Sequence, residues 1–478
     1  MSKKYVIGID GGSQSTKVVI FDLEGRVVSE GKEKLRPLQR PSPGVAEHPD
    51  DDLWNSLVIA CRRAFEDFYG DVGDILAVGL CTIRCCRADL KKDGSLASPV
   101  MSWMDARLSK PYEHVNPEVS YVTTSSGYIG HRITGEFQDT ASNYEGPWPI
   151  DKDTWDWSMD QEVLQHYNLP PRMLFDLVKP GSLLGTVTPE AAAQTCIPAG
   201  LPVAATANDN AVEALGVGLM PGNTLLVSLG TYIGSMVYGK ENIKDAQSFF
   251  SNMASVPDKF LYESGGIRKG MWTVSWFKDL LGEEFVSRAH AMGSSPEALL
   301  DAEAEKINAG SDGLMTVLDW LAPPDRPFKK GLMIGFDARH TRAHMFRSIL
   351  EGIALTMKNY ADAMCEELGM MLDSIIVSGG GSNSTVFMQI FSDVFGVPAV
   401  RTMINESASV GSAICAASAV GYYDSFAEAV SRMVHQKDVF TPIDEHTELY
   451  KEMNEQVYKH VTEYTDSIFR KSYPIFGK

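Results

Sequence analysis

Short, mostly apolar runs separated by glycine-rich stretches set the pattern of this chain. Such runs occupy residues 5–9 and 17–21 on either side of a polar stretch, and the same order returns at 224–227 and 232–238. Two runs of strand length joined by a short turn that contains glycine are typical of a β-hairpin. We therefore predict one hairpin near the start of each half of the chain.

Beyond the hairpins the pattern alternates between strands and helices. Helices are expected over residues 50–69, 271–281, 296–308 and 343–368, strands over 75–81 and 374–377, and a last helix, rich in small residues, from about Glu406. Strands that alternate with helices favour an α/β fold with parallel strands. The small residues of the last helix would let it lie close to a sheet or to a bound nucleotide.

Length and turn residues indicate two domains. A chain of 478 residues is too long for one ordinary hydrophobic core, so two domains with room for a cleft are expected. Three glycines and a proline cluster between residues 216 and 222, just before the second hairpin. We place the boundary there, which gives an N-terminal domain of residues 1–217 and a C-terminal domain of residues 218–478.

The charge of the chain narrows the range of partners. It has 62 acidic and 43 basic residues and a net charge of −19. Such a surface repels nucleic acid and anionic lipid, and no basic run offsets it, so neither is an expected partner.

No apolar stretch has the length of a membrane span or a secretory leader, and the odd number of seven cysteines favours a reducing compartment. A cytoplasmic location is therefore expected.

The tip of the first hairpin has the composition of a phosphate site. Gly11 and Gly12 let backbone N–H groups approach an anion, and consecutive N–H groups form a concave site for phosphate oxygens. Asp10 is itself anionic, so its natural partner is magnesium, which keeps several waters and takes few protein carboxylates. An ordinary hairpin turn is the structural alternative. Related glycine stretches at 228–231 and 378–383 favour the phosphate site, and the strand after the first loop excludes the P-loop and dinucleotide motifs.

Two charged residues follow predicted strands. Arg84 comes after the strand over 75–81, and Asp209 comes after the apolar run 202–207. Because loops at the carboxyl ends of strands carry ligand contacts in open α/β sheets, Arg84 is a candidate substrate residue. Phosphoryl transfer needs a base aimed at the acceptor hydroxyl, and Asp209 is the best candidate. The alternative is that Asp209 caps a helix starting at residue 210 or 211.

The order of these motifs along the whole chain resembles the FGGY family of carbohydrate kinases. The matching stretches are residues 8–17, 103–107, 132–137, 208–210, 228–231, 331–336, 344–345, 348–351, 379–381 and 406–408. Phe336 departs from the family, which usually has a smaller aliphatic residue there. The resemblance implies the two-domain α/β fold of actin, sugar kinases and the Hsp70 ATPase, with ribonuclease H-like domains and a cleft between them.

The resemblance also implies roles for single residues. Asp10 would position magnesium through water, and Asp209 would deprotonate the acceptor hydroxyl. Together with the glycine stretches, it gives the expected ATP-binding residues Gly11, Gly12, Ser13, Thr16, Lys17, Gly230, Thr231, Gly379, Gly380, Gly381 and Asn383. The residues expected around the acceptor are Arg84, Cys85, Trp103, Asp105, Asp209 and Asn210.

The match loosens around the acceptor. Glycerol kinases carry an Arg–Glu pair where this chain has Arg84 and Cys85, and a thiol cannot hold two hydroxyls as a carboxylate does. The loop over 321–327 also departs from the usual family sequence. Asp105 has a structural alternative, an internal salt bridge with Arg107, and His48 is expected to be a solvated loop residue.

These observations predict an ATP- and magnesium-dependent kinase, most similar to xylulokinases, that phosphorylates a terminal hydroxyl of a small sugar or polyol. A pentulose such as xylulose or ribulose is the first expectation. A tetritol, a glycerol-type polyol or a sugar acid is the alternative, because Arg84 suits a neutral hydroxyl and a carboxylate equally. An ATP-driven conformational switch of the same fold and a catalytically silent regulator are further alternatives. Homodimers are frequent in the family, so a homodimer is one expected state.

Overall fold

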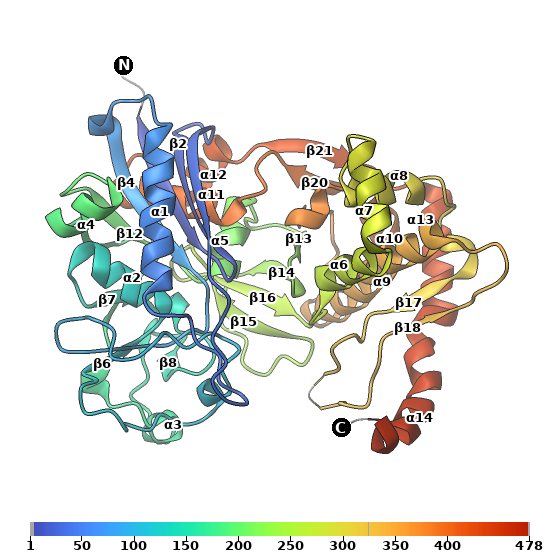
Figure 1. Cartoon of the computed structure of the whole chain (residues 1–478), viewed down its shortest axis with the longest axis horizontal. Coiled ribbons are helices and arrows are strands. Elements are labelled where there is room, and N and C mark those ends of the chain that lie inside the picture. The colour runs from blue at the N-terminus through green and yellow to red at the C-terminus, as the bar shows by residue number, and fades with distance from the viewer. Residues whose placement is uncertain (1–3, 324, 477–478) are drawn as a thin grey trace.

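The first of two main β-sheets is built from the N-terminal half of the chain. The computed structural model describes residues 4–323 and 325–476 (Figure 1). In this sheet the strand order is β11-β12-β4-β1-β2-β3. The strands are β1 (Tyr5–Gly11), β2 (Ser15–Asp22), β3 (Val27–Lys34), β4 (Ile75–Thr82), β11 (Leu183–Thr186) and β12 (Pro202–Ala205). β1, β2 and β3 form an antiparallel meander, whereas β1, β4 and β12 run parallel to one another.

The second sheet repeats this arrangement in the C-terminal half. Its strand order is β15-β16-β14-β13-β19-β20-β21. The strands are β13 (Thr224–Leu229), β14 (Ile233–Gly239), β15 (Phe249–Met253), β16 (Phe260–Ser264), β19 (Ser374–Ser378), β20 (Ala399–Thr402) and β21 (Gln436–Phe440). β13 pairs antiparallel with β14 and parallel with β19, as β1 pairs with β2 and β4. Both predicted hairpins are confirmed, and each begins a sheet of the same local topology.

The first sheet is covered by helices on both faces. Ile7 of β1 packs in one hydrophobic cluster with Leu57 of α1 (Asp52–Glu66), whereas its neighbour Val6 packs in another with Val410 of α11 (Ser407–Ala419). Successive side chains of a strand point to opposite faces, so both faces of β1 are apolar and buried. This explains why its sequence is a continuous apolar run.

The two halves exchange helices between the sheets. α11 comes from the C-terminal half but packs on the first sheet, and α5 (Asp209–Gly216) packs in a cluster with Leu226 of the second sheet (Figure 1). A Cβ on Gly8 or Gly79 would lie 2.0 or 1.9 Å from the backbone oxygen of Ser409 or Ser412 in α11. The predicted close packing of this small-residue helix on a sheet is therefore confirmed. A division at residue 217 separates the sheets but not the helices that cover them.

The remaining helices lie mostly in the C-terminal half. They are α2 (Ser125–Thr134), α3 (Gln161–Tyr167), α4 (Pro189–Thr195), α6 (Gly270–Leu280), α7 (Gly282–Ala291), α8 (Pro296–Ala304), α9 (Arg342–Leu368), α10 (Thr385–Phe395), α12 (Phe426–Met433), α13 (Asp444–Met453) and α14 (Lys459–Phe476). The expectation that the helix after Glu406 is the last one is wrong, because α12, α13 and α14 follow it. No described helix combines the length and the apolar composition that crossing a bilayer requires.

Residues 88–178 add short paired strands beside the first sheet. They are β5 (Ala88–Leu90) with β6 (Tyr121–Thr123), β7 (Gln138–Thr140) with β10 (Asp176–Val178), and β8 (Ile150–Asp151) with β9 (Asp156–Trp157). Tyr112, Tyr144 and Trp148 form part of a small core of their own in this region. A further short pair, β17 (Met315–Val317) with β18 (Leu332–Ile334), precedes α9.

Candidate active site

The parallel strands bring the predicted site residues to one edge of each sheet. β1 and β4 are neighbours, so Asp10 and the loop that holds Arg84 lie together at their carboxyl ends. β12 is parallel to β4, and Asp209 begins α5 soon after β12 ends. On the second sheet Ser228 pairs with Ser378, so the second hairpin and the third glycine stretch lie side by side. Open α/β sheets bind their ligands at this edge.

The first hairpin presents a backbone turn. The Gly12 N–H donates to the carbonyl oxygen of Ser15 over 3.1 Å, and Ser13 at the tip is exposed. Gly11 precedes the turn and is partly buried. Lys17 lies opposite Asp10 in the strand register, and its Nζ is 3.3 Å from Glu406 Oε1. The hairpin is thereby tied to the residue that precedes α11.

Thr16 is placed differently from the rest of the hairpin tip. Its side chain is buried, and its Oγ1 lies 2.7 Å from Ser56 Oγ in α1. This position does not fit a contact of the Thr16 side chain with ATP, as predicted, because the hydroxyl is turned into the core.

Asp10 lies near other acidic groups at the base of this hairpin. Burial raises the pKa of Asp10 to about 6; the charge of Lys17 opposes the rise, and those of Asp209 and Glu406 add to it. Within the described residues, no three or more His, Cys, Asp or Glu side chains form a group that could hold a metal ion. Magnesium does not require such a group, since it usually keeps several waters and takes one or two carboxylates beside nucleotide phosphates. Asp10 therefore fits the predicted magnesium contact.

The second hairpin is anchored through the carbonyl groups of its tip. The N–H groups of Gly270 and Met271, at the start of α6, donate to the carbonyl oxygens of Thr231 and Gly230 over 2.8 and 3.3 Å. Thr231 itself is exposed. The tip is therefore fixed from one side while its other side stays open.

The third glycine stretch packs against the second hairpin. Gly379 has φ 85° and ψ 177°, a conformation essentially restricted to glycine, and a Cβ there would lie 2.6 Å from the Leu229 carbonyl oxygen. A Cβ on the buried Gly381 would lie 2.7 Å from Leu229 Cδ1. Gly380 has open space around it, and Asn383 is exposed. Gly379 and Gly381 thus make the turn, and Gly380 and Asn383 form its open side.

Asp209 is the first residue of α5 but does not cap it. Asn208 is the N-cap, and its side chain accepts a hydrogen bond from the Ala211 N–H over 3.1 Å. The Asp209 carboxylate accepts one from the Asn210 N–H over 3.1 Å, and 34 % of the side chain is exposed. Burial raises the pKa of Asp209, and the charge of Arg84 opposes the rise. Asn208, and not Asp209, therefore caps the helix, and the carboxylate of Asp209 stays accessible.

Glu213 is a site residue that the sequence analysis missed. It lies four residues after Asp209, on the same face of α5, and accepts hydrogen bonds from Ser228 Oγ over 2.8 and 3.0 Å. Burial raises the pKa of Glu213, and hydrogen bonds from Ser378 and Ser228 oppose the rise. Its spacing from Asp209 was the signal that could have identified it.

Arg84 forms a bidentate ion pair with Glu263 of β16, a second residue that the sequence analysis missed. Its Nη1 and Nη2 donate to Glu263 Oε1 and Oε2 over 3.0 and 3.2 Å, and its Nε lies 3.9 Å from Asp209 Oδ1. Asn210 Nδ2 is 3.4 Å from Glu263 Oε2, and Asn252 also donates to this carboxylate. The pair joins the loop after β4 to the second sheet. A glutamate inside an apolar strand was the available signal.

Cys85 sits in a strained turn beside Arg84. Its φ is 60°, and its Sγ lies 3.8 Å from the Glu145 carbonyl oxygen. Burial raises the pKa of the thiol to about 11, so it stays protonated at neutral pH. Trp103 is about half exposed. Cys85 therefore presents a neutral, weakly polar thiol to the expected acceptor site and not an anionic thiolate.

Asp105 has the structural role that the sequence left open. Its carboxylate is buried and accepts hydrogen bonds from the Ala46 N–H over 2.8 Å and from Arg107 Nη2 over 2.7 Å. Arg107 also donates to Glu47 over 2.6 Å. The internal salt bridge is present, and the carboxylate is engaged by Arg107 and by the backbone of the loop that holds Ala46 instead of pointing to an acceptor.

His48 is not the solvated loop residue that was expected. Only 2 % of it is exposed, and neither ring nitrogen has a hydrogen-bond partner among the described residues. Burial lowers the pKa of His48, and the charge of Asp52 opposes this change. The imidazole is therefore held neutral near the start of α1.

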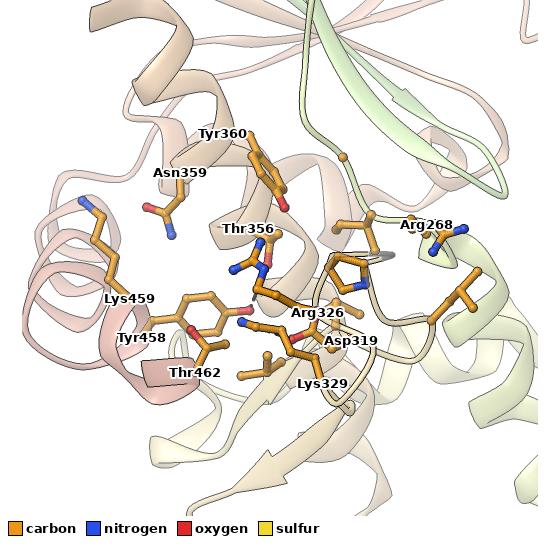
Figure 2. A pocket seen from close by; sticks show the side chains of 16 residues that line it. Arg268, Asp319, Arg326, Lys329, Thr356, Asn359, Tyr360, Tyr458, Lys459 and Thr462 are labelled. Carbon is orange, nitrogen blue, oxygen red and sulfur yellow. Dashed lines mark hydrogen bonds and ion pairs between the residues drawn. The ribbon is translucent and has the colours of Figure 1, made fainter. Parts of the chain in front are cut away.

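A cavity of about 440 Å³ lies in the C-terminal half and contains none of the predicted site residues (Figure 2). Figure 2 shows Arg326 and Lys329 among its lining side chains. Arg326 pairs with Asp325 at 3.2 Å, and Lys329 Nζ lies 3.7 Å from Asp466 and 4.0 Å from Asp319. Arg326 and Lys329 are thus each paired with an acidic side chain, and Arg268 and Lys459 are two further cations of the lining.

Comparisons with known proteins agree with this geometry. Residues 225–420 match the C-terminal domain of the FGGY family of carbohydrate kinases, and two overlapping stretches, 5–120 and 108–216, match its N-terminal domain. The uncharacterized sugar kinase YgcE of Escherichia coli K12 is 53 % identical over 475 residues, covering 99 % of this chain and 96 % of that protein. An autoinducer-2 kinase of Klebsiella pneumoniae is 26 % identical over 498 residues, covering 94 % and 92 % of the two chains.

Solved structures share the whole fold. A xylulose kinase from Rhodospirillum rubrum superposes with a TM-score of 0.81 at 23 % identity, covering 98 % of this chain and 100 % of that one. A gluconate kinase from Lactobacillus acidophilus gives 0.83 at 19 % identity, with the same coverage. The architecture is therefore the predicted two-domain, actin-like ATPase fold.

Proposed function

The chain belongs to the FGGY family of carbohydrate kinases and is an ATP-dependent sugar kinase, and from this premise we propose that it phosphorylates a terminal hydroxyl of a small sugar or polyol. A pentulose such as xylulose or ribulose is the first candidate. The observation that carries the proposal is the placement of Asp209. Its carboxylate is accessible, is not a helix cap, and lies next to Arg84 at the edge that Asp10 shares.

In the proposed reaction, the glycine turns of both sheets bind ATP and Asp209 acts on the acceptor. Backbone groups at the Gly12 and Gly230 turns hold the phosphates of ATP, and the turn at Gly380 and Asn383 faces the adenosine. Asp209 orients the acceptor hydroxyl and takes its proton as the oxygen attacks the terminal phosphorus in line, while the bond from that phosphorus to the bridging oxygen breaks and ADP leaves with the electron pair. Asp10 would hold magnesium, and the ion would supply positive charge to offset that of the phosphates.

The acceptor side supports a short, polyhydroxylated substrate. Arg84 and Asn210 present N–H donors suited to hydroxyl or carbonyl oxygens. Cys85 replaces the glutamate that glycerol kinases carry, which disfavours glycerol and leaves room for another short polyol. A tetritol is the nearest alternative to a pentulose.

Acceptor-stimulated ADP release tests the proposal. Purified protein is mixed with ATP and magnesium and assayed across pentuloses, pentitols, tetritols, glycerol, hexuloses and sugar acids. Strong stimulation by one or two related compounds is expected, and mass spectrometry of the product should show a phosphate on a terminal carbon. Slow ADP release that no acceptor in the panel stimulates would contradict the proposed substrate class.

A further inference from the structure

We propose that Glu263 is a specificity-determining residue that neutralises Arg84, so that the acceptor site takes a neutral sugar or polyol and rejects a sugar acid. This inference rests on the proposed function and deepens it by naming the charge of the substrate. An arginine in a sugar site suits a carboxylate as well as a hydroxyl. The surroundings of Arg84 decide between the two.

Glu263 already occupies the carboxylate-binding fork of Arg84. The two guanidinium N–H groups on Nη1 and Nη2 meet its two oxygens at 3.0 and 3.2 Å. This parallel geometry is the one by which arginine binds a carboxylate ligand. A sugar acid would have to displace Glu263 or bind beside it.

Displacement is opposed by the way Glu263 is held. Its side chain is only 5 % exposed, and it extends from β16, which pairs with β14 and β15 on its two sides. Asn210 Nδ2 lies 3.4 Å from Oε2, and Asn252 donates to Oε1. Moving the carboxylate away would leave a buried anion without these partners, which is costly.

Binding beside Glu263 is opposed by the local charge. Arg84 is flanked by Glu263 and by Asp209, with 3.9 Å between Arg84 Nε and Asp209 Oδ1, so two carboxylates face one guanidinium. Lys152 does not offset this negative charge. It donates to the carbonyl oxygen of Ser251 on β15 and is itself paired with Glu145 at 2.6 Å. A third carboxylate here would meet an excess of negative charge.

A neutral acceptor faces no such conflict. Arginine has five N–H donors, and Glu263 uses only two of those on Arg84. Among the described residues the other three make no hydrogen bond, although Nε lies 3.9 Å from Asp209 Oδ1, so they can donate to hydroxyl or carbonyl oxygens; 22 % of the Arg84 side chain is exposed. Glu263 thus neutralises the charge of Arg84 and fixes its position, which leaves N–H groups that can donate to an uncharged ligand.

The test compares neutral acceptors with the sugar acids of equal carbon number, pentuloses and pentitols against pentonates. For the wild type, we expect kcat/KM to favour the best neutral acceptor by about 100-fold or more. Glu263→Gln keeps the shape and removes the charge, and should lower this ratio by at least about tenfold, chiefly by lowering KM for the acid. Glu263→Asp keeps the charge and should keep the preference even if overall activity falls.

Glu351→Gln is the matched control. Glu351 is likewise a buried carboxylate in an ion pair with an arginine, 2.8 Å from Arg347 Nε, but it lies within α9 and contacts none of the site residues. Its variant should leave the ratio of neutral to acidic acceptors unchanged. An equal shift in this control and in Glu263→Gln would overturn the assigned role.

The wild type alone also decides the inference if Glu263→Gln does not fold. Pentonate should be a poor substrate and a weak competitive inhibitor against the neutral acceptor. A wild type that prefers a sugar acid would overturn the inference and leave the kinase proposal standing. A wild type that no neutral or acidic acceptor stimulates would overturn both.

Discussion

Around the predicted nucleotide the chain presents backbone in three glycine-containing turns, whereas around the predicted acceptor it presents side chains from three separate elements. The turns at Gly12, Gly230 and Gly379 each follow a strand end within a few residues. Arg84, Asp209 and Glu263 come from the loop after β4, from α5 and from β16. The nucleotide side therefore depends on local conformation and the acceptor side on long-range charge pairing.

The difference bears on how each side tolerates change. A phosphate is the same in every ATP-dependent kinase, and backbone N–H groups recognise it without a particular side chain. A sugar is recognised by a few directed hydrogen bonds, so substitutions at two or three positions can alter specificity. Substitutions on the nucleotide side should thus act by straining the backbone of the glycine turns. Substitutions on the acceptor side should act by changing the side-chain groups that bind the sugar.

The largest expected effect is on the acceptor side. Asp209→Asn removes the base but keeps the size of the residue, so acceptor-stimulated ADP release should fall by about 10²–10⁴-fold. ATP binding, measured by calorimetry, should change little, because the glycine turns do not depend on this carboxylate. Retention of most of the acceptor-stimulated rate would contradict the assignment of Asp209.

The next effect concerns the ion pair that joins the two sheets. Arg84→Met leaves Glu263 buried without its partner, and we expect the free energy of unfolding to fall by about 2–4 kcal/mol. Arg84→Met combined with Glu263→Met removes both charges and should recover much of the loss. Urea denaturation of the two variants measures this difference. A double variant less stable than Arg84→Met would show that the pair does not act as proposed.

A smaller effect is expected on the nucleotide side. Gly379→Ala forces a Cβ into a glycine-only conformation, 2.6 Å from the Leu229 carbonyl oxygen. It should cost about 1–3 kcal/mol and weaken ATP binding. Gly380→Ala is the matched control, because the space around Gly380 is open. Thermal unfolding of both variants tests the strain argument, and an equal loss of stability in both would refute it; ATP titration of Gly379→Ala measures the effect on binding.

The smallest effect concerns His48, whose folded-state pKa is lowered from 6.5 by burial, a change that Asp52 opposes. Below pH 6.5 the unfolded chain binds a proton at this residue more readily than the folded chain, so stability falls as pH drops. Above pH 6.5 both states are neutral and the effect vanishes. His48→Gln should flatten this part of the curve of thermal midpoint against pH between 5 and 8. An unchanged slope would contradict the burial of a neutral imidazole.

Much of the fold could be predicted because its signals are local. The two hairpins follow from apolar runs around glycine turns, and α9 and β19 appear close to their expected positions. The exchange of α5 and α11 between the sheets was not predictable in this way, since periodicity shows that a face is apolar but not which sheet covers it. The small residues of α11 and the glycines that face it, at positions 8, 79 and 216, were the signal for its close approach.

The residue pattern alone identified the groups that could do chemistry: glycines at strand ends, Asp10 near the end of one strand, Asp209 after another, and an arginine at the same edge. The tertiary structure decided which way they point and what they meet. Thr16 stands between Ser15 and Lys17 at the polar start of β2, and only the folded chain shows that its hydroxyl meets Ser56 of α1. Glu263 is 179 residues from Arg84, and no local pattern records a contact over that distance. Charge pairing depends on distance in space, which only the folded chain sets.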